Sequence, residues 1–363
     1  MTVDLNLFNG KSVFITGHTG FKGSWLAFWL TELGAKVTGY ALEPYYNDSL
    51  FEKLKLDTKV NHIIGDIRDK ETLADKLAQA KPEFVFHLAA QALVKKSYAD
   101  PYLTFSTNSL GSVNILEATR ECKSVKSLVY ITSDKCYVNK EWTWGYREND
   151  ELGGNDPYSA SKACAEHIFK SYFMSYFKDR AGFACGSARA GNVIGGGDLS
   201  QDRIVPDIIR SCESNNPIIL RSPQATRPWQ HVLDPLYGYL ILALSQYQSP
   251  EKFNGESWNF GPSGQSIRTV LELAQELKSI WGQDSIKIDY TKDSTHEANL
   301  LHLSIDKARD QLKWNPTFDF NEAIKKTGEW YKTVSEGSDP TTITQQQIRS
   351  FTNNLNNKIS SDG

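Results

Sequence analysis

The segment from residue 12 to residue 41 constrains the fold more than any other part of the chain. It begins with a short apolar run, Ser12–Thr16, of the kind found in buried parallel strands. A glycine-rich turn at residues 17–23 follows, and then an apolar helix that is expected to end near Gly34 and a second strand over residues 35–41. This order predicts the strand–turn–helix–strand unit that binds dinucleotides.

The glycine spacing explains how this turn could hold a cofactor. Gly17 and Gly20 allow a tight turn and a close approach of the backbone to a pyrophosphate, while Gly23 allows the helix to pack closely. The helix N-terminus then faces the anion. The cofactor contacts predicted from this turn are Gly17, His18, Thr19, Gly20, Phe21, Lys22 and Gly23.

The end of the second strand leaves the choice between NAD and NADP open. Many dinucleotide sites place an acid there to bind the ribose hydroxyls. This chain has Ala41 at the expected place, with Glu43 two residues further on. Lys22 and His18 could favour the 2′-phosphate of NADP, or Lys22 could contact only solvent or the pyrophosphate. NAD is the predicted cofactor, and NADP is not excluded.

Further strands and helices alternate along the chain, which predicts an α/β fold with a Rossmann-type doubly wound parallel sheet. The predicted strands are His62–Ile67, Phe84–Ala90, Ser127–Thr132 and Phe183–Arg189. Cofactors bind at the carboxyl edge of such a sheet. Asp66 could accept a hydrogen bond from an adenine amino group, or it could instead cap the helix that starts near Asp69. The further cofactor contacts predicted at this edge are Asp66, Ile67, Leu88, Ala89, Ala90 and Asn108.

The chain length of 363 residues suits two domains. We predict a dinucleotide-binding domain over residues 1–190, with a return of the chain near 228–260. After Arg189 the sequence mixes loops, prolines and short elements, which predicts a smaller C-terminal α+β substrate-binding domain over residues 191–334. Residues 335–363 form a polar tail whose composition predicts partial disorder.

Charge and composition exclude several classes of function. Forty basic residues against 43 acidic ones give a net charge of −3, which argues against binding to nucleic acid or to a membrane surface. The sequence has no apolar span of about 18 or more residues, and no signal peptide is expected, because its start lacks a basic region followed by an apolar run. Five cysteines without a C-x-x-C pair indicate a reducing compartment, so a cytoplasmic location is expected.

No metal site is predicted. His296, Glu297 and His302 superficially resemble a zinc-binding helix, but the spacing is H-E-x-x-x-x-H rather than H-E-x-x-H. We interpret these residues as a loop and strand of the substrate domain.

Tyr158 and Lys162 are the strongest catalytic candidates. Asp156 is a good N-cap and Pro157 suits the first helical position, so Tyr158 and Lys162 share one face of the predicted helix. An ammonium beside the phenol is expected to lower the phenol pKa from its ordinary value of about 10. A phenolate could then take a proton from a sugar hydroxyl. In isolation the two residues could equally be a pair on the surface of a helix. The catalytic interpretation therefore depends on whether the chain also builds a nicotinamide site.

Polar residues at two other places complete the predicted site. Ser133, Asp134 and Lys135 follow a strand directly, where catalytic groups tend to lie, although an exposed loop is the alternative. Arginines of the substrate domain could bind a diphosphate bidentately, although a single arginine is more often a surface charge. Arg203, Arg210, Arg221 and Arg227 are candidates of this kind. The predicted substrate contacts are Gln91, Asn192, Arg203, Arg227 and His231.

Four motifs in this order resemble the extended short-chain dehydrogenase/reductase family over roughly residues 10–333. They are Gly17-x-x-Gly20-x-x-Gly23, His87-Leu88-Ala89-Ala90, Tyr158-x-x-x-Lys162 and Arg189-x-x-Asn192-Val193. Members of this family act on nucleotide sugars as epimerases, dehydratases and decarboxylases. Residues 132–137, 17–23 and 226–231 most resemble the branch that removes water from a CDP-linked hexose. The resemblance therefore implies CDP-glucose as the small-molecule substrate.

The resemblance also implies roles for the residues. Tyr158, aided by Lys162 and Ser133, would remove the C4 hydroxyl proton while hydride passes to NAD⁺. Lys135, where related dehydratases usually have Glu, would take the C5 proton, which requires a neutral amine. Asp134 would protonate the departing C6 hydroxyl, and hydride would return to C6.

Two alternatives remain at this point. A nucleotide-sugar 4-epimerase shares Tyr158 and Lys162 but needs no acid and base for elimination, so Asp134 and Lys135 disfavour it. A dinucleotide-sensing protein without turnover is disfavoured by the intact Tyr158–Lys162 pair. The resemblance further implies a homodimer or homotetramer that pairs helices through residues 104–121 and 157–180. It also implies a place in dideoxyhexose synthesis for a surface polysaccharide such as lipopolysaccharide O-antigen.

Overall fold

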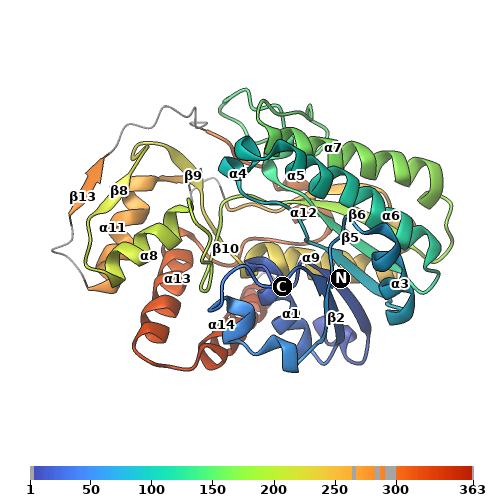
Figure 1. Ribbon diagram of the computed structural model, residues 1–363, viewed down its shortest axis with the longest axis horizontal. Helices are drawn as coiled ribbons and strands as arrows, with labels where there is room; N and C mark the ends of the chain where they lie inside the picture. The colour runs from blue at the N-terminus through green and yellow to red at the C-terminus, as the bar shows by residue number, and fades with distance from the viewer. Residues whose placement is uncertain (1–3, 264–266, 283–286, 291–299, 362–363) are drawn as a thin grey trace.

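The computed structural model describes residues 4–263, 267–282, 287–290 and 300–361. Its main body is a parallel sheet covered by helices on both faces, with a smaller lobe beside it (Figure 1). The lobe contains the short elements that follow residue 191, and a cleft separates it from the carboxyl edge of the sheet.

The central sheet has seven strands in the order β11-β6-β5-β4-β1-β2-β3. Every neighbouring pair is parallel. The predicted Rossmann-type doubly wound sheet is therefore confirmed. The strands are β1 Ser12–Thr16, β2 Lys36–Ala41, β3 Asn61–Ile64, β4 Phe84–His87, β5 Ser127–Ile131, β6 Ala184–Arg189 and β11 Glu256–Asn259.

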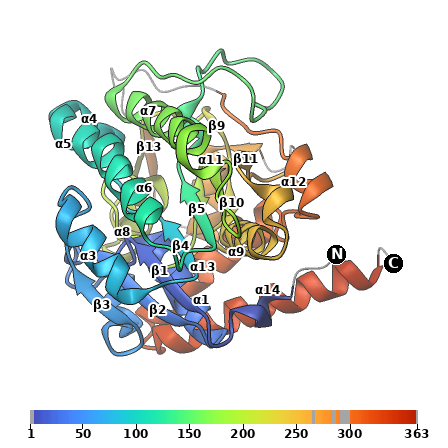
Figure 2. The same ribbon diagram turned by 90° about the vertical axis from the view of Figure 1, so that its right-hand side faces the viewer.

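Alternate side chains of the strands enter two separate cores, because successive residues of a strand point to opposite faces. Val13 and Ile15 of β1 pack on one face with Trp25 of α1. Phe14 packs on the other face, against the core that includes Leu73 of α3. The first face carries α1 Phe21–Glu32, α9 Leu233–Gln248, α13 Phe320–Ser335 and α14 Pro340–Ser361, and the second carries α3 Lys70–Ala80, α6 Gly111–Glu121 and α7 Pro157–Tyr172 (Figure 2).

Two predicted strands end earlier than expected. β3 ends at Ile64 and β4 ends at His87, so residues 65–67 and 88–90 leave the sheet. These residues form part of the cleft wall. The shorter strands therefore release backbone and small side chains toward a ligand.

Within the described residues, the lobe contains short strands that pair with one another and not with the central sheet. The pairs are β7 Val193–Ile194 with β10 Gln230–His231, β8 Ile218–Leu220 with β13 Ile288–Tyr290, and β9 Thr226–Pro228 with β12 Ile267–Thr269. Two helices, α8 Ile204–Glu213 and α11 Val270–Trp281, pack beside them. Between these pieces, α9 and β11 return to the main sheet, where β11 pairs with β6.

The C-terminal segment differs from the prediction of partial disorder, because α14 is a helix over Pro340–Ser361. Ile348 and Phe351 are buried, and the Phe351 ring lies 5.6 Å from that of Trp29 and 5.3 Å from that of Phe318. The prediction relied on average polarity, which hides a few apolar residues at helical spacing. Those residues dock the helix on the core.

The remaining elements are short. They are α2 Leu50–Lys53, α4 Val94–Ala99, α5 Pro101–Phe105, α10 Pro250–Phe253, α12 Asp306–Gln311, the 3₁₀ turns Leu5–Phe8, Leu56–Thr58 and Asp134–Cys136, and the π-helical turns Ser106–Leu110 and Phe173–Phe177. Among the helices of the described ranges, none has the length and apolar character needed to cross a bilayer.

Candidate active site

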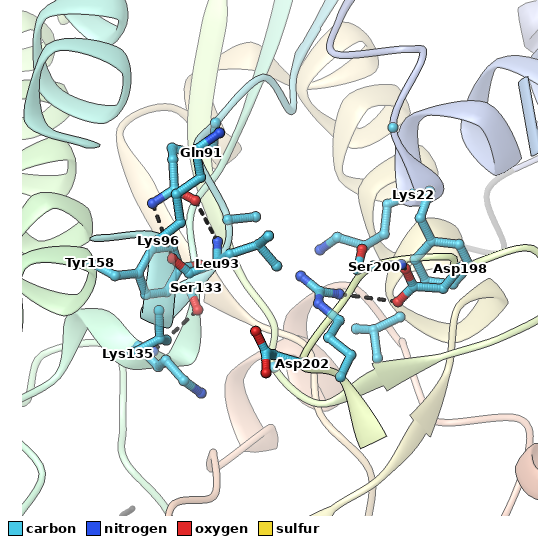
Figure 3. A pocket seen from close by; sticks show the side chains of 18 of the residues that line it. Lys22, Gln91, Leu93, Lys96, Ser133, Lys135, Tyr158, Asp198, Ser200 and Asp202 are labelled. Atoms are coloured by element: carbon cyan, nitrogen blue, oxygen red, sulfur yellow. Dashed lines mark hydrogen bonds and ion pairs between the residues drawn. The ribbon is translucent and has the colours of Figure 1, made fainter. Parts of the chain in front are cut away.

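A cleft of about 1200 Å³ lies along the carboxyl edge of the sheet. Its walls come from the segments that follow β1, β2, β3, β4 and β5, from α4 and α7, and from the loops after β6 and β8. Figure 3 shows Gln91, Ser133, Lys135 and Tyr158 on one side of the cleft, Lys22, Asp198 and Ser200 on the other, and Asp202 between them.

The glycine-rich turn has the geometry that a pyrophosphate requires. Gly17 has a φ of +79°, and a Cβ there would lie 2.7 Å from the Ala89 nitrogen. A Cβ at Gly23 would lie 2.0 Å from the Gly17 oxygen, so only glycine lets α1 start this close to the turn. At Gly20 a Cβ would meet only the Gly17 oxygen, at 3.5 Å. The N-cap residue Gly20 has no side chain to cap α1, and residues 19–23 at the start of this helix line the cleft.

His18 does not contact the cleft, in contrast to the prediction. Its ring is fully buried, and its Nε2 lies 2.6 Å from Nδ1 of His62. Burial and the neighbouring His62 lower the pKa of His18 to about 3, so the ring is neutral. A neutral ring on the far side of the turn cannot bind the 2′-phosphate of NADP.

Lys22 lines the cleft but lies near the catalytic groups. Its Nζ donates a hydrogen bond of 3.2 Å to the hydroxyl of Tyr239. Burial lowers the pKa of Lys22 to about 7, with contributions from Lys162 and Arg203 and an opposing one from Asp134. These neighbours indicate a position at the centre of the cleft, not beside Ala41 where the adenine ribose is expected. The option that Lys22 and His18 select NADP therefore has no support in this geometry.

The loops after β3 and β4 supply most of the other predicted cofactor contacts. Asp66, Ile67, Leu88, Ala89 and Ala90 all line the cleft. Asp66 does not cap the following helix, because Asp69 caps α3 by accepting a hydrogen bond of 3.1 Å from the Thr72 nitrogen. The Asp66 carboxylate instead accepts hydrogen bonds from Arg68.

Asn108 lies behind the cleft wall and is not among the residues that line it. Its Oδ1 accepts a hydrogen bond of 2.8 Å from the Gln91 nitrogen, and its Nδ2 donates to the Gln91 oxygen at 3.0 Å and to Ser161 Oγ at 2.9 Å. The side chain therefore joins the loop after β4 to helix α7. It supports the wall, and the prediction of a direct cofactor contact is corrected.

Helix α7 begins as the sequence predicts and carries Tyr158 and Lys162 into the cleft. Asp156 is the N-cap, accepting a hydrogen bond of 3.0 Å from the Ser159 nitrogen, and Pro157 takes the first helical position. Burial raises the pKa of Tyr158 to about 12, with opposing contributions from a hydrogen bond with Ser133 and from the charge of Arg203. The lowered phenol pKa expected from the sequence is therefore not found, because burial outweighs the favourable neighbours.

Burial also acts on the lysine of this pair. It lowers the pKa of Lys162 to about 8, against opposing contributions from Cys136 and Glu166. Tyr158 and Lys162 are 8% and 6% exposed, so both reactive groups are largely removed from bulk water.

Ser133, Asp134 and Lys135 lie together directly after β5. The Ser133 hydroxyl donates to Asp134 Oδ1 at 2.9 Å and accepts from the Lys135 nitrogen at 3.3 Å. Asp134 is 1% exposed, and its Oδ2 has no hydrogen-bond partner among the described residues. A Cβ at Gly191 would lie 1.9 Å from Oδ2, so glycine there leaves room for the carboxylate. Lys135 Nζ lies 3.8 Å from Asp134 Oδ1.

A buried ion pair behind these groups was not predicted from the sequence. Arg189 donates to both carboxylate oxygens of Glu166, at 2.9 and 2.8 Å, and each side chain is 2% exposed. Although burial opposes ionisation, the charge and hydrogen bonds of Arg189 hold the pKa of Glu166 below its ordinary value. The pair ties α7 to β6. The sequence did contain one signal for this pair: Glu166 follows Lys162 by four residues and therefore lies on the same face of the predicted helix.

Most of the predicted substrate contacts line the cleft. Gln91, Asn192, Arg203 and Arg227 do so, as does Arg221. The Gln91 side chain is already engaged, donating to Thr104 Oγ1 at 2.9 Å and accepting from the Leu93 nitrogen at 2.7 Å. Asn192 has a left-handed φ of +51°, and its Nδ2 finds no hydrogen-bond partner among the described residues.

His231 and Arg210 are exceptions, since neither is among the lining residues. His231 is fully buried between the rings of Trp25 and Phe318, and burial lowers its pKa to about 3. Arg210 pairs with Asp207. The predicted substrate contact at His231 is therefore corrected to a core position.

No group of three or more His, Cys, Asp or Glu side chains in the described part of the chain could hold a metal ion. His296 and Glu297, whose spacing was considered above, lie outside the described residues.

The fold and the cleft together are those of a dinucleotide-binding protein with a tyrosine–lysine pair at the carboxyl edge of the sheet. A family model described as GDP-mannose 4,6 dehydratase matches residues 14–327, and the chain belongs to this family of nucleotide-sugar enzymes. The resemblance to extended short-chain dehydrogenases/reductases is thereby confirmed.

Individual relatives agree with this placement. A CDP-glucose 4,6-dehydratase of Salmonella typhimurium is 46% identical over 353 residues, which cover 96% of this chain and 98% of the relative. A dTDP-glucose 4,6-dehydratase of Bacillus anthracis, solved in complex with NAD, superposes with a TM-score of 0.74 at 20% identity, covering 91% and 99% of the two chains. A UDP-glucose 4-epimerase of Thermotoga maritima, solved with UDP-glucose, gives 0.78 at 22%, covering 89% and 99%. The two structures share the fold.

Proposed function

We propose that this protein is a CDP-glucose 4,6-dehydratase, a hydro-lyase that converts CDP-D-glucose to CDP-4-keto-6-deoxy-D-glucose with bound NAD. The placement of Asp134 and Lys135 beside Ser133 carries this proposal. A 4-epimerase needs only Tyr158 and Lys162, whereas elimination of water needs an additional acid and base. The relative that is 46% identical over nearly the whole of both chains is a CDP-glucose 4,6-dehydratase.

The cleft fits an NAD molecule in several respects. The glycine turn and the start of α1 line the cleft, and Ala89 and Ala90 offer small side chains next to them. Asp66 and Glu43 line the same end of the cleft, where carboxylates suit adenosine hydroxyl and amino groups. When bound, NAD⁺ would accept a hydride from the sugar and return it, and its positive charge would favour the Tyr158 phenolate.

The side chains of this protein supply the proton transfers. Tyr158 takes the proton of the C4 hydroxyl, with Ser133 hydrogen-bonded to it and Lys162 on the same helical face. Lys135 takes the C5 proton that the neighbouring C4 ketone makes acidic. Asp134 gives a proton to the leaving C6 hydroxyl, and its buried carboxyl accepts a hydrogen bond from Ser133 on Oδ1 while Oδ2 has no hydrogen-bond partner within the described residues. Loss of water leaves a 4-keto-5,6-ene, and return of the hydride to C6 together with a proton given back to C5 by Lys135 completes the 4-keto-6-deoxy sugar.

The lobe side of the cleft holds the nucleotide diphosphate. Arg203 and Arg227 line it, and guanidinium groups bind phosphate oxygens bidentately. The free Nδ2 of Asn192 provides a neutral donor for the sugar or a phosphate oxygen.

A substrate panel tests the overall proposal. Purified protein with NAD is mixed separately with CDP-, UDP-, dTDP- and GDP-glucose, and the 4-keto product is followed by its alkaline absorbance. Signal from CDP-glucose well above the other three is expected. Formation of the C4 epimer without a keto product would instead establish an epimerase, and absence of any turnover would leave a binding protein.

The base at C5 has its own test. In D₂O, turnover by the wild type should place deuterium at C5 of the product. Lys135→Ala should lose this exchange while binding NAD normally. Retained C5 exchange in the variant would remove Lys135 from the role of base.

We also propose that the protein pairs as a homodimer through the outer faces of α4 to α7, and that it acts in the cytoplasm. Large apolar side chains are exposed on these elements and on the π-helical turn after α7, namely Tyr98, Tyr102, Leu110, Met174 and Tyr176. Such a patch favours a protein interface. Light scattering should give twice or four times the chain mass. Leu110→Lys should shift the protein to monomer, and a wild-type monomer would contradict this assignment.

A further inference from the structure

One carboxylate, that of Asp202, holds two of the cations that line the cleft. Asp202 Oδ1 lies 2.7 Å from Nζ of Lys95 and 3.9 Å from Nη1 of Arg221. Lys95 belongs to α4, Arg221 follows β8, and Asp202 lies in the loop before α8. All of these residues line the cleft, so charges from separate elements converge there on a single oxygen atom.

The same loop, residues 198–203, neutralises a further lining cation. Arg203 Nη1 lies 3.4 Å from Asp198 Oδ2, while Asp198 Oδ1 accepts a hydrogen bond of 3.0 Å from the Ser200 nitrogen. Two carboxylates therefore face Lys95, Arg203 and Arg221. A nucleoside diphosphate would offer the same cations a similar pair of negative groups.

The backbone at Asp202 supports a specific role for this side chain. Its φ of +60° lies in the left-handed region, which few residues other than glycine, asparagine and aspartate adopt. The side chains of Lys95 and Asp202 are 48% and 47% exposed, so solvent screens their pairing and makes it easy to replace.

We infer that Asp202 is a selectivity residue that occupies the place of a substrate phosphate and is displaced by it. The inference rests on the proposed function, because it requires a nucleoside-diphosphate substrate. The carboxylate keeps Lys95 and Arg221 close together, which their mutual repulsion would otherwise oppose. A ligand must bring enough negative charge to replace it, so diphosphates are selected over monophosphates. The cost of this selection is weaker binding of the diphosphate itself.

Asp202→Asn tests this role, because asparagine keeps the shape, tolerates the left-handed backbone and removes the charge. Calorimetric titration of the full-length protein with CDP, CMP and inorganic pyrophosphate gives the affinities. CDP and pyrophosphate should bind about threefold to tenfold more tightly to the variant, consistent with the loss of exposed ion pairs. The ratio of CDP affinity to CMP affinity should be lower in the variant than in the wild type. The increase in CDP and pyrophosphate affinity should become smaller as salt is added.

Asp75→Asn is the matched control. Asp75 lies on α3, pairs with Lys76 at 3.6 Å and is not among the residues lining the cleft, so the same change in net charge should leave all three affinities unchanged. Equal thermal unfolding of both variants and the wild type verifies that the fold is intact.

Unchanged or weaker CDP and pyrophosphate binding in Asp202→Asn would overturn the inference. Weaker binding would mean that Asp202 holds the cleft walls together around the ligand. A further titration with UDP tests the proposed function separately: if the wild type binds pyrophosphate but binds UDP as tightly as CDP, the proposed base specificity fails. The comparison of Asp202→Asn with wild type on pyrophosphate still decides the role of Asp202.

Discussion

The two walls of the cleft carry their charged side chains in very different surroundings. The catalytic wall, formed by Ser133, Asp134, Tyr158 and Lys162, rises from β5 and α7 and is almost completely buried. The lobe wall carries its arginines on loops, and the side chain of Arg203 is 37% exposed against 2% for that of Asp134.

The consequences for ionisation and for binding differ accordingly. On the catalytic wall, burial moves the pKa of Tyr158 up to about 12 and the pKa of Lys162 down to about 8. On the lobe wall, Lys95 and Asp202 pair while about half exposed to solvent, where an ion pair is weak and replaceable. Chemistry that depends on a tuned proton affinity is thus built on the rigid sheet edge, and recognition of a charged ligand is assigned to adaptable loops.

Removal of the Tyr158 hydroxyl should produce the largest effect on catalysis and is the most direct test of the role assigned to the catalytic wall. Tyr158→Phe should reduce kcat by about 10²- to 10⁴-fold, the range of general acid–base catalysis, because no other group accepts the C4 proton. Single-turnover measurement of nicotinamide absorbance after mixing with CDP-glucose follows the first hydride transfer. Near-normal turnover would show that the catalytic wall has another base.

Glu166→Gln should produce the largest effect on stability. It leaves the buried Arg189 guanidinium without its counter-charge, which typically costs about 3–5 kcal/mol in the free energy of unfolding. Urea unfolding followed by circular dichroism measures the change. The control Glu117→Gln removes a partly exposed pair with Arg120 and should cost at most about 1 kcal/mol. Equal losses in the free energy of unfolding for Glu166→Gln and Glu117→Gln would mean that burial does not determine how much these two ion pairs contribute to stability.

Acid should expose the buried neutral histidines. Burial lowers the pKa of His18, His87 and His231 to about 3, whereas an unfolded histidine has a pKa of about 6.5. Between these values the unfolded chain binds more protons, so stability is lost as pH falls, by up to about 1.4 kcal/mol per pH unit for each histidine.

The pH dependence of urea unfolding between pH 6.5 and pH 5 measures this proton uptake. His231→Gln should reduce the slope by the share of one proton. An unaltered slope in His231→Gln would show that this ring is already protonated in the folded protein.

The smallest effect is expected on the lobe wall. Arg203→Gln should raise the KM for CDP-glucose by about tenfold with little change in kcat, because a charged hydrogen bond to phosphate is lost in ground state and transition state alike. Arg210→Gln is the matched control, since Arg210 does not line the cleft and pairs with Asp207. A loss in kcat at Arg203 would instead place this residue in the chemical step.

Local sequence rules were sufficient where chain-neighbour contacts decide the structure. The apolar strands, the glycine turn and the cap at Asp156 gave the doubly wound sheet and the start of α7. The same rules failed at His18, Asn108 and His231, whose side chains face away from the cleft. A motif in the sequence predicts where the backbone of its neighbouring residues lies. The direction of a side chain depends instead on partners that are distant in sequence, such as His62, Ser161 or Phe318.

The sequence by itself determined the parallel sheet, the nucleotide turn and the grouping of Ser133, Asp134 and Lys135, because these follow from short-range spacing. Only the tertiary structure decided that the Tyr158 pKa rises instead of falling, that Glu166 and Arg189 form a buried pair, and that Asp202 meets Lys95 and Arg221. Burial and charge pairing are properties of the space around a group. That space is filled by segments whose separation along the chain carries no local signal.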